Sequence, residues 1–182
     1  MADFYPNHKT LLLRDDAKES KIISELKTAD VAHFAMHFVA NDESEMLSGF
    51  PLTPESSDSS ATSNGILQSY EIYGLSLRRT RLVVLSACQT GIEKQYRGEG
   101  AVGAARPFIV AGVPTVVASL WSVDSDASVQ LMVEFHKNRR HSMPVVKALK
   151  QSQIEFINGQ NPLYRHPYYW APFLTIGGLS SY

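Results

Sequence analysis

The sequence predicts an α/β fold in which a mostly parallel sheet is covered by helices on both faces. Short apolar runs alternate along the chain with segments of helical periodicity. These runs are nearly continuous rather than interrupted by polar residues, which is typical of strands buried on both faces. With 182 residues and 44% hydrophobic composition, the chain can bury one core. We therefore expect residues 1–182 to form a single three-layer α/β/α domain.

The N-terminal third of the chain predicts two strands separated by a helix. One strand-like run covers residues 10–13 and a second covers residues 31–36. Between them, three apolar residues fall on one helix face: Ile22, Ile23 and Leu26. Residues 51–65 contain five serines, and we expect a flexible surface loop there. This loop is either a solvated insertion or a segment that flanks a substrate groove.

The remaining strands are expected over residues 81–87, 115–120 and 173–176. Pro107 lies inside the helix before the fourth strand and is expected to kink or divide it. Ser125 is expected to cap a helix that reaches about His136. A further helix begins at Pro144 and stops near Asn158.

Composition restricts the class of partner and the compartment. Seventeen basic and eighteen acidic residues give a net charge of −1, which argues against nucleic acid or an anionic membrane as a partner. A single cysteine cannot form an intrachain disulfide, which fits a reducing cytoplasm. No segment resembles a signal peptide or approaches the ~18 apolar residues of a membrane span. We therefore expect a cytoplasmic protein.

Two of the predicted strands end in residues that can carry chemistry. The run LVVLSAC ends at Cys88, and the run VAHFAMH ends at His37. If these strands are parallel neighbours, the thiol and the imidazole meet at one edge of the sheet. A thiol with the ordinary pKa of about 8.5 needs such a base to become a nucleophilic thiolate. The glycine-containing turn after Cys88 also brings backbone N–H groups that can hold an oxyanion.

A second histidine, His33, competes with His37 for the role of base. On a strand the two lie about 13 Å apart, too far to share a metal ion, so their spacing does not predict a zinc site. His33 is mid-strand and is expected to be a hydrogen-bonded core residue. His37 is at the strand end and is the expected general base and acid.

Several ordered motifs together carry a family resemblance. They are VVLSACQTG with HFAMH upstream, RGEG before an alanine-rich helix, VVASLWSVD, and HPYYWAPF before the last strand. From about Thr10 to Gly178 the chain resembles the CHAT family of caspase-like cysteine peptidases. The resemblance implies a caspase-like sandwich, whose further N-terminal strands this chain lacks. It also implies Cys88 as nucleophile, His37 as base, a protein or peptide substrate, and no metal or organic cofactor. Because the family's peptidase unit commonly follows tetratricopeptide repeats or other sensor modules, a regulated protease is expected.

One residue departs from the family pattern. The family usually has glycine directly after its catalytic histidine, whereas this chain has Phe38. The N–H of Phe38 can still join that of Cys88 in an oxyanion hole. Its Cβ restricts φ, however, and can reshape the groove or reduce activity.

Three residues after the fourth strand are candidates for substrate binding. Asp124 and Asp126 either cap the next helix or line a specificity pocket that favours arginine or lysine. Trp121 either packs at the rim or lines a peptide groove. The GEGAVG segment, residues 98–103, matches GxGxxG but does not directly follow a strand, so its glycines are expected to permit close helix packing instead.

These observations leave two principal hypotheses. The first is a cysteine endopeptidase that cleaves a dedicated protein through a Cys88–His37 dyad, under the control of a partner or sensor module. The second is a non-catalytic CHAT-like regulatory or interaction module, or a fragment of one. A Cys-dependent hydrolase of small esters or amides is a third possibility, which no pocket signal supports.

Overall fold

The computed structural model describes residues 4–5, 9–55, 64–86, 100–122, 124–140 and 143–178. The helices are α1 (Glu19–Thr28), α2 (Ser69–Tyr73), α3 (Gly100–Val110), α4 (Ser125–Arg140), α5 (Val145–Ile157) and α6 (Pro167–Trp170). The strands are β1 (Val31–Phe34), β2 (Gly49–Pro51), β3 (Ile66–Gln68), β4 (Leu82–Leu85), β5 (Thr115–Ser119) and β6 (Phe173–Gly177). Short 3-10 turns cover Arg14–Asp16, Glu45–Leu47 and Pro162–Arg165.

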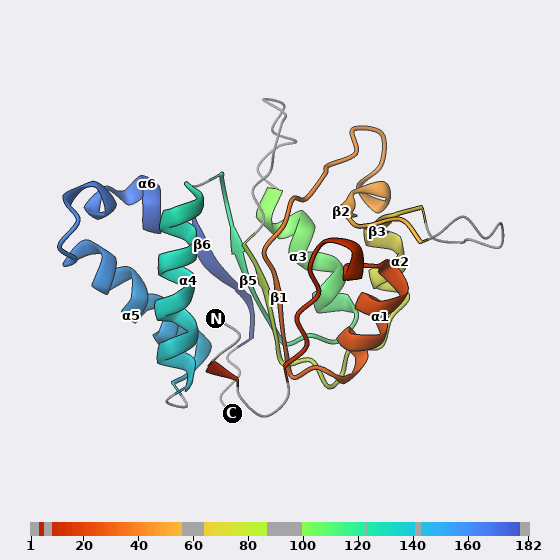
Figure 1. Cartoon of the computed structure of the whole chain (residues 1–182), viewed down its shortest axis with the longest axis horizontal. Coiled ribbons are helices and arrows are strands. Elements are labelled where there is room, and N and C mark those ends of the chain that lie inside the picture. Colours follow the sequence, from red (N-terminus) through yellow and green to blue (C-terminus); the bar gives the residue numbers. More distant parts are fainter. Residues whose placement is uncertain are drawn as a thin grey trace.

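A four-stranded sheet in the order β1-β4-β5-β6 forms the centre of the molecule (Figure 1). β1, β4 and β5 run parallel, and β6 pairs antiparallel with β5. The expected mostly parallel sheet is confirmed. The antiparallel direction of β6 was not predicted, because its run of five residues carries no signal of orientation.

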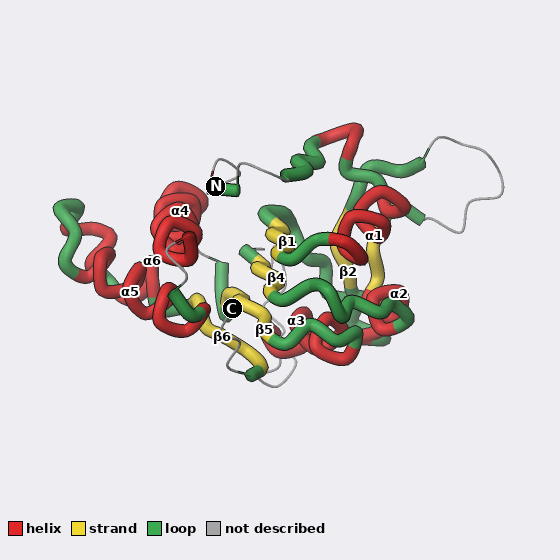
Figure 2. The backbone as a smooth tube through the Cα atoms, turned by 90° about the horizontal axis from the view of Figure 1, so that it is seen from below, coloured by secondary structure: helices red, strands yellow, loops and turns green. Residues whose placement is uncertain are grey.

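Helices cover both faces of this sheet, as Figures 1 and 2 show. α1, α2 and α3 lie on one side, and α4, α5 and α6 lie on the other. Alternate residues of β4 point into different cores: Val83 and Leu85 join the α1–α3 side, and Leu82 and Val84 join the α4–α5 side. All four are at most 2% exposed, which explains the uninterrupted apolar run.

The expectation of a strand at residues 10–13 is wrong. This segment has no strand pairing, and Leu11 and Leu13 are more than half exposed, while Leu12 packs against the core. The Thr10 hydroxyl donates to a Glu25 carboxylate oxygen at 2.8 Å and so ties the segment to α1. One partly buried leucine in the run is too little apolar surface to specify a strand.

The serine-rich segment is flanked by a strand pair that the sequence did not predict. β2 and β3 pair antiparallel, and Pro51, assigned to the loop, is the last residue of β2. Residues 56–63 of the predicted flexible loop lie outside the described residues. α2 follows β3 through a capping box, in which the Gln68 N–H donates to the Glu71 carboxylate at 2.7 Å.

The helices after β4 largely follow the predicted pattern. α3 is not divided at Pro107 but runs on to Val110. α4 includes Ser125, which was expected to be its cap, and extends past His136 to Arg140; the cap is Asp124. α5 starts directly after Pro144 and ends at Ile157.

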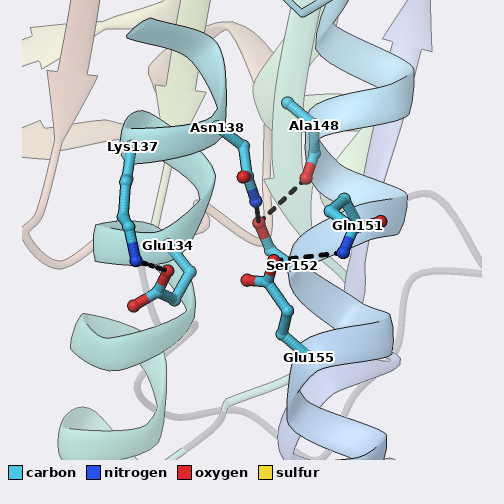
Figure 3. Close-up of polar contacts among 7 residues, drawn as sticks. All are labelled: Glu134, Lys137, Asn138, Ala148, Gln151, Ser152 and Glu155. Carbon is cyan, nitrogen blue, oxygen red and sulfur yellow. Dashed lines mark hydrogen bonds and ion pairs between the residues drawn. The ribbon is translucent and has the colours of Figure 1, made fainter. Parts of the chain in front are cut away.

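Helices α4 and α5 are joined by a buried polar bridge, drawn in Figure 3. The Asn138 amide donates to the Ser152 hydroxyl at 3.1 Å, and that hydroxyl donates to the Ala148 carbonyl at 2.8 Å. Ser152 is fully buried and its bond to Ala148 is shielded from water, whereas its bond to Asn138 is partly buried. The bridge therefore helps to fix the position of α4. This position matters for the candidate site described below, because α4 carries His136.

Candidate functional site

The strand register aligns the segments that carry the predicted chemistry. Phe34 of β1 lies opposite Leu85 of β4, and Leu85 lies opposite Ala118 of β5. His37, Cys88 and Trp121 each follow three positions after one of these aligned residues. Three neighbouring parallel strands thus end at the same level, which is the edge where ligands bind in such sheets.

Cys88 itself lies in residues 87–99, outside the described residues. Ser86 is the last described residue before it. The Ser86 N–H donates to the Phe34 carbonyl at 3.0 Å, so the β1–β4 pairing extends to the residue two positions before Cys88.

The two competing histidines occupy different environments. β1 ends at Phe34, earlier than the predicted 36, and His37 is exposed in the segment that follows. His33 lies inside β1 and is partly buried, with both ring nitrogens hydrogen bonded. Its predicted character as a hydrogen-bonded core histidine is confirmed.

Phe38 turns its side chain into the core and away from the sheet edge. It is 6% exposed, and its ring centroid lies 5.1 Å from that of Phe50 in β2. Among the described residues, Arg14 is the one non-glycine residue with a positive φ. The backbone at Phe38 therefore does not require glycine, and its ring anchors the segment after His37 to the α1–α3 core.

The residues after β5 are connected to α4 and α6. Asp124 Oδ1 accepts hydrogen bonds from the N–H groups of Asp126 and Ala127 at 3.1 and 3.0 Å, so Asp124 caps α4. The Trp121 indole donates to the Tyr168 carbonyl at 3.2 Å, and Trp121 remains 38% exposed. Both aspartates are exposed near the same sheet edge.

Sequence reasoning missed a buried polar chain beside this edge. His33 Nδ1 lies 3.0 Å from His136 Nε2, and His33 Nε2 lies 2.5 Å from Ser86 Oγ. The Tyr5 hydroxyl lies 2.8 Å from His136 Nδ1. The sequence signal was the position of His136, which directly follows Phe135 on the buried face of α4.

His33 and His136, the two histidines in this series of hydrogen bonds, are both held uncharged. Burial lowers the pKa of His33 to about 4. Burial, followed by the neighbouring charge of His33, lowers the pKa of His136 to about 3. At neutral pH neither imidazole takes up a proton, so neither suits the role of general base there.

The described residues contain no group of three or more His, Cys, Asp or Glu side chains that could hold a metal ion.

Within the GEGAVG segment, a Cβ added at Gly103 would meet no described atom within 4 Å, so close packing does not explain that glycine. Among the described helices, none is long and apolar enough to cross a membrane.

Comparison with known proteins adds two findings. The model of the CHAT domain family matches residues 2–178. Tetratricopeptide repeat protein 28 of Homo sapiens is 24% identical over 194 residues, which cover 88% of this chain and 8% of that protein. The chain thus spans less than a tenth of the length of this relative.

Proposed function

Since the chain belongs to the CHAT domain family of caspase-like peptidases, we propose that it is a cysteine endopeptidase that acts through Cys88 and His37. The observation that carries this proposal is the common register of β1 and β4. Phe34 and Leu85 are paired, and the two candidate residues each follow three positions later. This arrangement supports a dyad at one edge of a caspase-like sheet.

The proposed reaction follows from these two side chains. His37 accepts the proton of the Cys88 thiol, and the thiolate attacks the scissile carbonyl carbon. The backbone N–H groups of Cys88 and Phe38 hold the oxyanion that forms. The carbon–nitrogen bond then breaks as His37 returns its proton to the leaving amine, and water hydrolyses the resulting thioester.

The exposed residues after β5 suggest how substrate is recognised. Asp124 and Asp126 follow a strand that is adjacent to β4, and Trp121 is in line with His37 and Cys88 by register. A carboxylate in this position pairs well with an arginine or lysine before the scissile bond. Trp121 supplies an apolar wall for the peptide.

The natural substrate is proposed to be a dedicated protein, and control is proposed to come from a sensor module. The similarity to a tetratricopeptide repeat protein supports an association with such repeats. Seventeen basic and eighteen acidic residues nearly balance to a net charge of −1, which is compatible with recognition of a protein segment.

A regulatory module without catalysis is the second candidate, and Phe38 favours it. A bulky residue replaces the family's glycine beside His37, although its ring lies in the core. In this reading, the same sheet edge would bind a partner without cutting it.

Incubation with a peptide library separates these candidates. The wild-type chain is expected to cleave a subset of peptides, and Cys88→Ala is expected to cleave none while it keeps the wild-type melting temperature. Removing a thiol at this position should cost about 1 kcal/mol or less of stability. Equal cleavage by wild type and Cys88→Ala would exclude the dyad. Absence of cleavage by both, with slow reaction of Cys88 toward a peptidyl acyloxymethyl ketone, would favour the regulatory module.

A further inference from the structure

A continuous chain of hydrogen bonds crosses from α4 to the end of β4. It links the Tyr5 hydroxyl, His136, His33 and the Ser86 hydroxyl through contacts of 2.8, 3.0 and 2.5 Å. The two imidazole rings stack at an interplanar angle of 28°, with centroids 5.1 Å apart. His136 is 2% exposed. Four polar groups from distant parts of the sequence thus meet under the α4 layer.

All hydrogen bonds in this series can form together only if both imidazoles are neutral. A neutral imidazole donates from one ring nitrogen and accepts at the other. If Tyr5 donates to His136, then His136 Nε2–H donates to His33, and His33 Nε2–H donates to Ser86. The Ser86 hydroxyl is then able to donate to the Phe34 carbonyl, 3.4 Å away. Each hydrogen bond polarises the next, so the chain behaves as one unit.

The series of hydrogen bonds ends at Ser86, a position that matters for the proposed function. Ser86 lies at the carboxyl end of β4, and Cys88 follows two residues later. Its main chain is tied to β1 through Phe34, and its side chain is tied to α4 through the two histidines. Both the backbone and the side chain at the last described residue before Cys88 are therefore fixed.

We propose that His33, His136 and Ser86 are positioning residues that orient the segment carrying the Cys88 nucleophile. This inference rests on the proposed function. None of the three acts on substrate. They set the direction in which the chain leaves β4 and so the alignment of the thiol with His37. A displacement of about 1 Å at a reacting group can cost up to a hundredfold in rate, which makes such support worthwhile.

The reactivity of Cys88 tests this proposal directly, because it is the only thiol in the chain. The rate of alkylation by iodoacetamide is measured against pH for wild type, Ser86→Ala and His136→Phe. Ser86→Thr restores the hydroxyl and serves as the rescue. Met132→Val, a buried change one turn earlier on α4, is the control for a general loss of packing.

The wild type is expected to give an apparent thiol pKa well below about 8.5, because a neighbouring imidazolium stabilises the thiolate. Ser86→Ala and His136→Phe should move this pKa up toward 8.5 and lower kcat about tenfold, with KM within about twofold. Ser86→Thr and Met132→Val should keep the wild-type profile. Superimposable profiles for wild type, Ser86→Ala and His136→Phe would overturn the positioning role while leaving the dyad intact. A wild-type pKa near 8.5 would instead remove the dyad, and the positioning role with it.

Discussion

His33 and His37 lie four positions apart on one segment, yet their surroundings differ completely. His33 is inside β1, with both ring nitrogens hydrogen bonded and its pKa lowered by burial to about 4. His37 lies beyond the strand, exposed at the edge where β1, β4 and β5 end together. The place where β1 ends, rather than the residue type, therefore distinguishes a structural imidazole from a candidate base.

The largest difference between the two histidines is expected when each is exchanged for alanine. His37→Ala is expected to lower kcat/KM by about a thousandfold or more, because general acid–base catalysis supplies about 10²–10⁴-fold. Its melting temperature should stay near that of wild type. His33→Ala should instead cost about 2–4 kcal/mol of stability, since it removes a packed ring and leaves His136 and Ser86 without their partner.

Both variants are compared by peptidase assay and by urea denaturation. His33→Ala should keep measurable activity at temperatures where it is folded, reduced about tenfold through the support of the Cys88 segment. The opposite pattern, with a stable but inactive His33→Ala and an active His37→Ala, would show that the roles are exchanged.

The pH dependence of stability sharpens the contrast between the two histidines. The folded-state pKa values of His33 and His136, about 4 and about 3, lie below the unfolded value of 6.5. Between these limits the unfolded chain binds more protons, so stability falls as the pH drops from 6.5 toward 4. The loss is about 2 kcal/mol per histidine between pH 6.5 and 4.5.

The measurement is the urea midpoint at several pH values for wild type, His136→Phe and His37→Ala. The other groups that act on the pair are the Tyr5 and Ser86 hydroxyls and the positive charges of the N-terminus and Arg139. His136→Phe should be less stable at pH 7 but lose less stability on acidification than wild type does. His37→Ala should follow the wild-type slope. An unchanged slope in His136→Phe would mean that His136 takes up no extra proton on unfolding.

The smallest expected effect concerns the aspartates after β5. Asn is also a good helix cap, so Asp124→Asn should keep the hydrogen bonds to Asp126 and Ala127 while removing the charge. We expect it, or Asp126→Asn, to lose several-fold to about a hundredfold in kcat/KM for arginine peptides and little for neutral ones.

Cleavage of a library that varies the residue before the scissile bond provides the readout. A profile led by aspartate or by bulky apolar residues, and unchanged in both variants, would leave the two aspartates with capping roles alone.

Much of the fold could be predicted from the sequence because its strands are buried on both faces. β4 and β5 gave uninterrupted apolar runs, and α5 was marked by Pro144 and Asn158. β2 and β3 were missed because three residues each are too few to show the alternating pattern of a strand, although Phe50 and Leu67 are buried in the core. Residues 10–13 were misassigned because the run has apolar character but only Leu12 packs against the core.

The strand ends of the candidate site could be predicted from the sequence. The hydrogen bonds among His33, His136 and Ser86 could not. Cys88 and His37 became candidates because each ends a strand-like run, which is a local pattern. The contact from His33 to His136 joins residues 103 positions apart, and that from His33 to Ser86 joins residues 53 apart. Such contacts depend on how α4 packs over β1, which no local pattern specifies. The sequence also could not show that the ring of Phe38 is buried against Phe50.

The central claim is that Cys88 and His37 form one catalytic unit at the shared end of β1 and β4. The most direct test is a crystal structure of the chain after reaction with a peptidyl acyloxymethyl ketone. We expect a covalent bond from Cys88 Sγ to the inhibitor and a His37 ring nitrogen within about 4 Å of that sulfur. A modified sulfur that lies about 8 Å or more from the His37 ring, or a Cys88 that does not react, would contradict it.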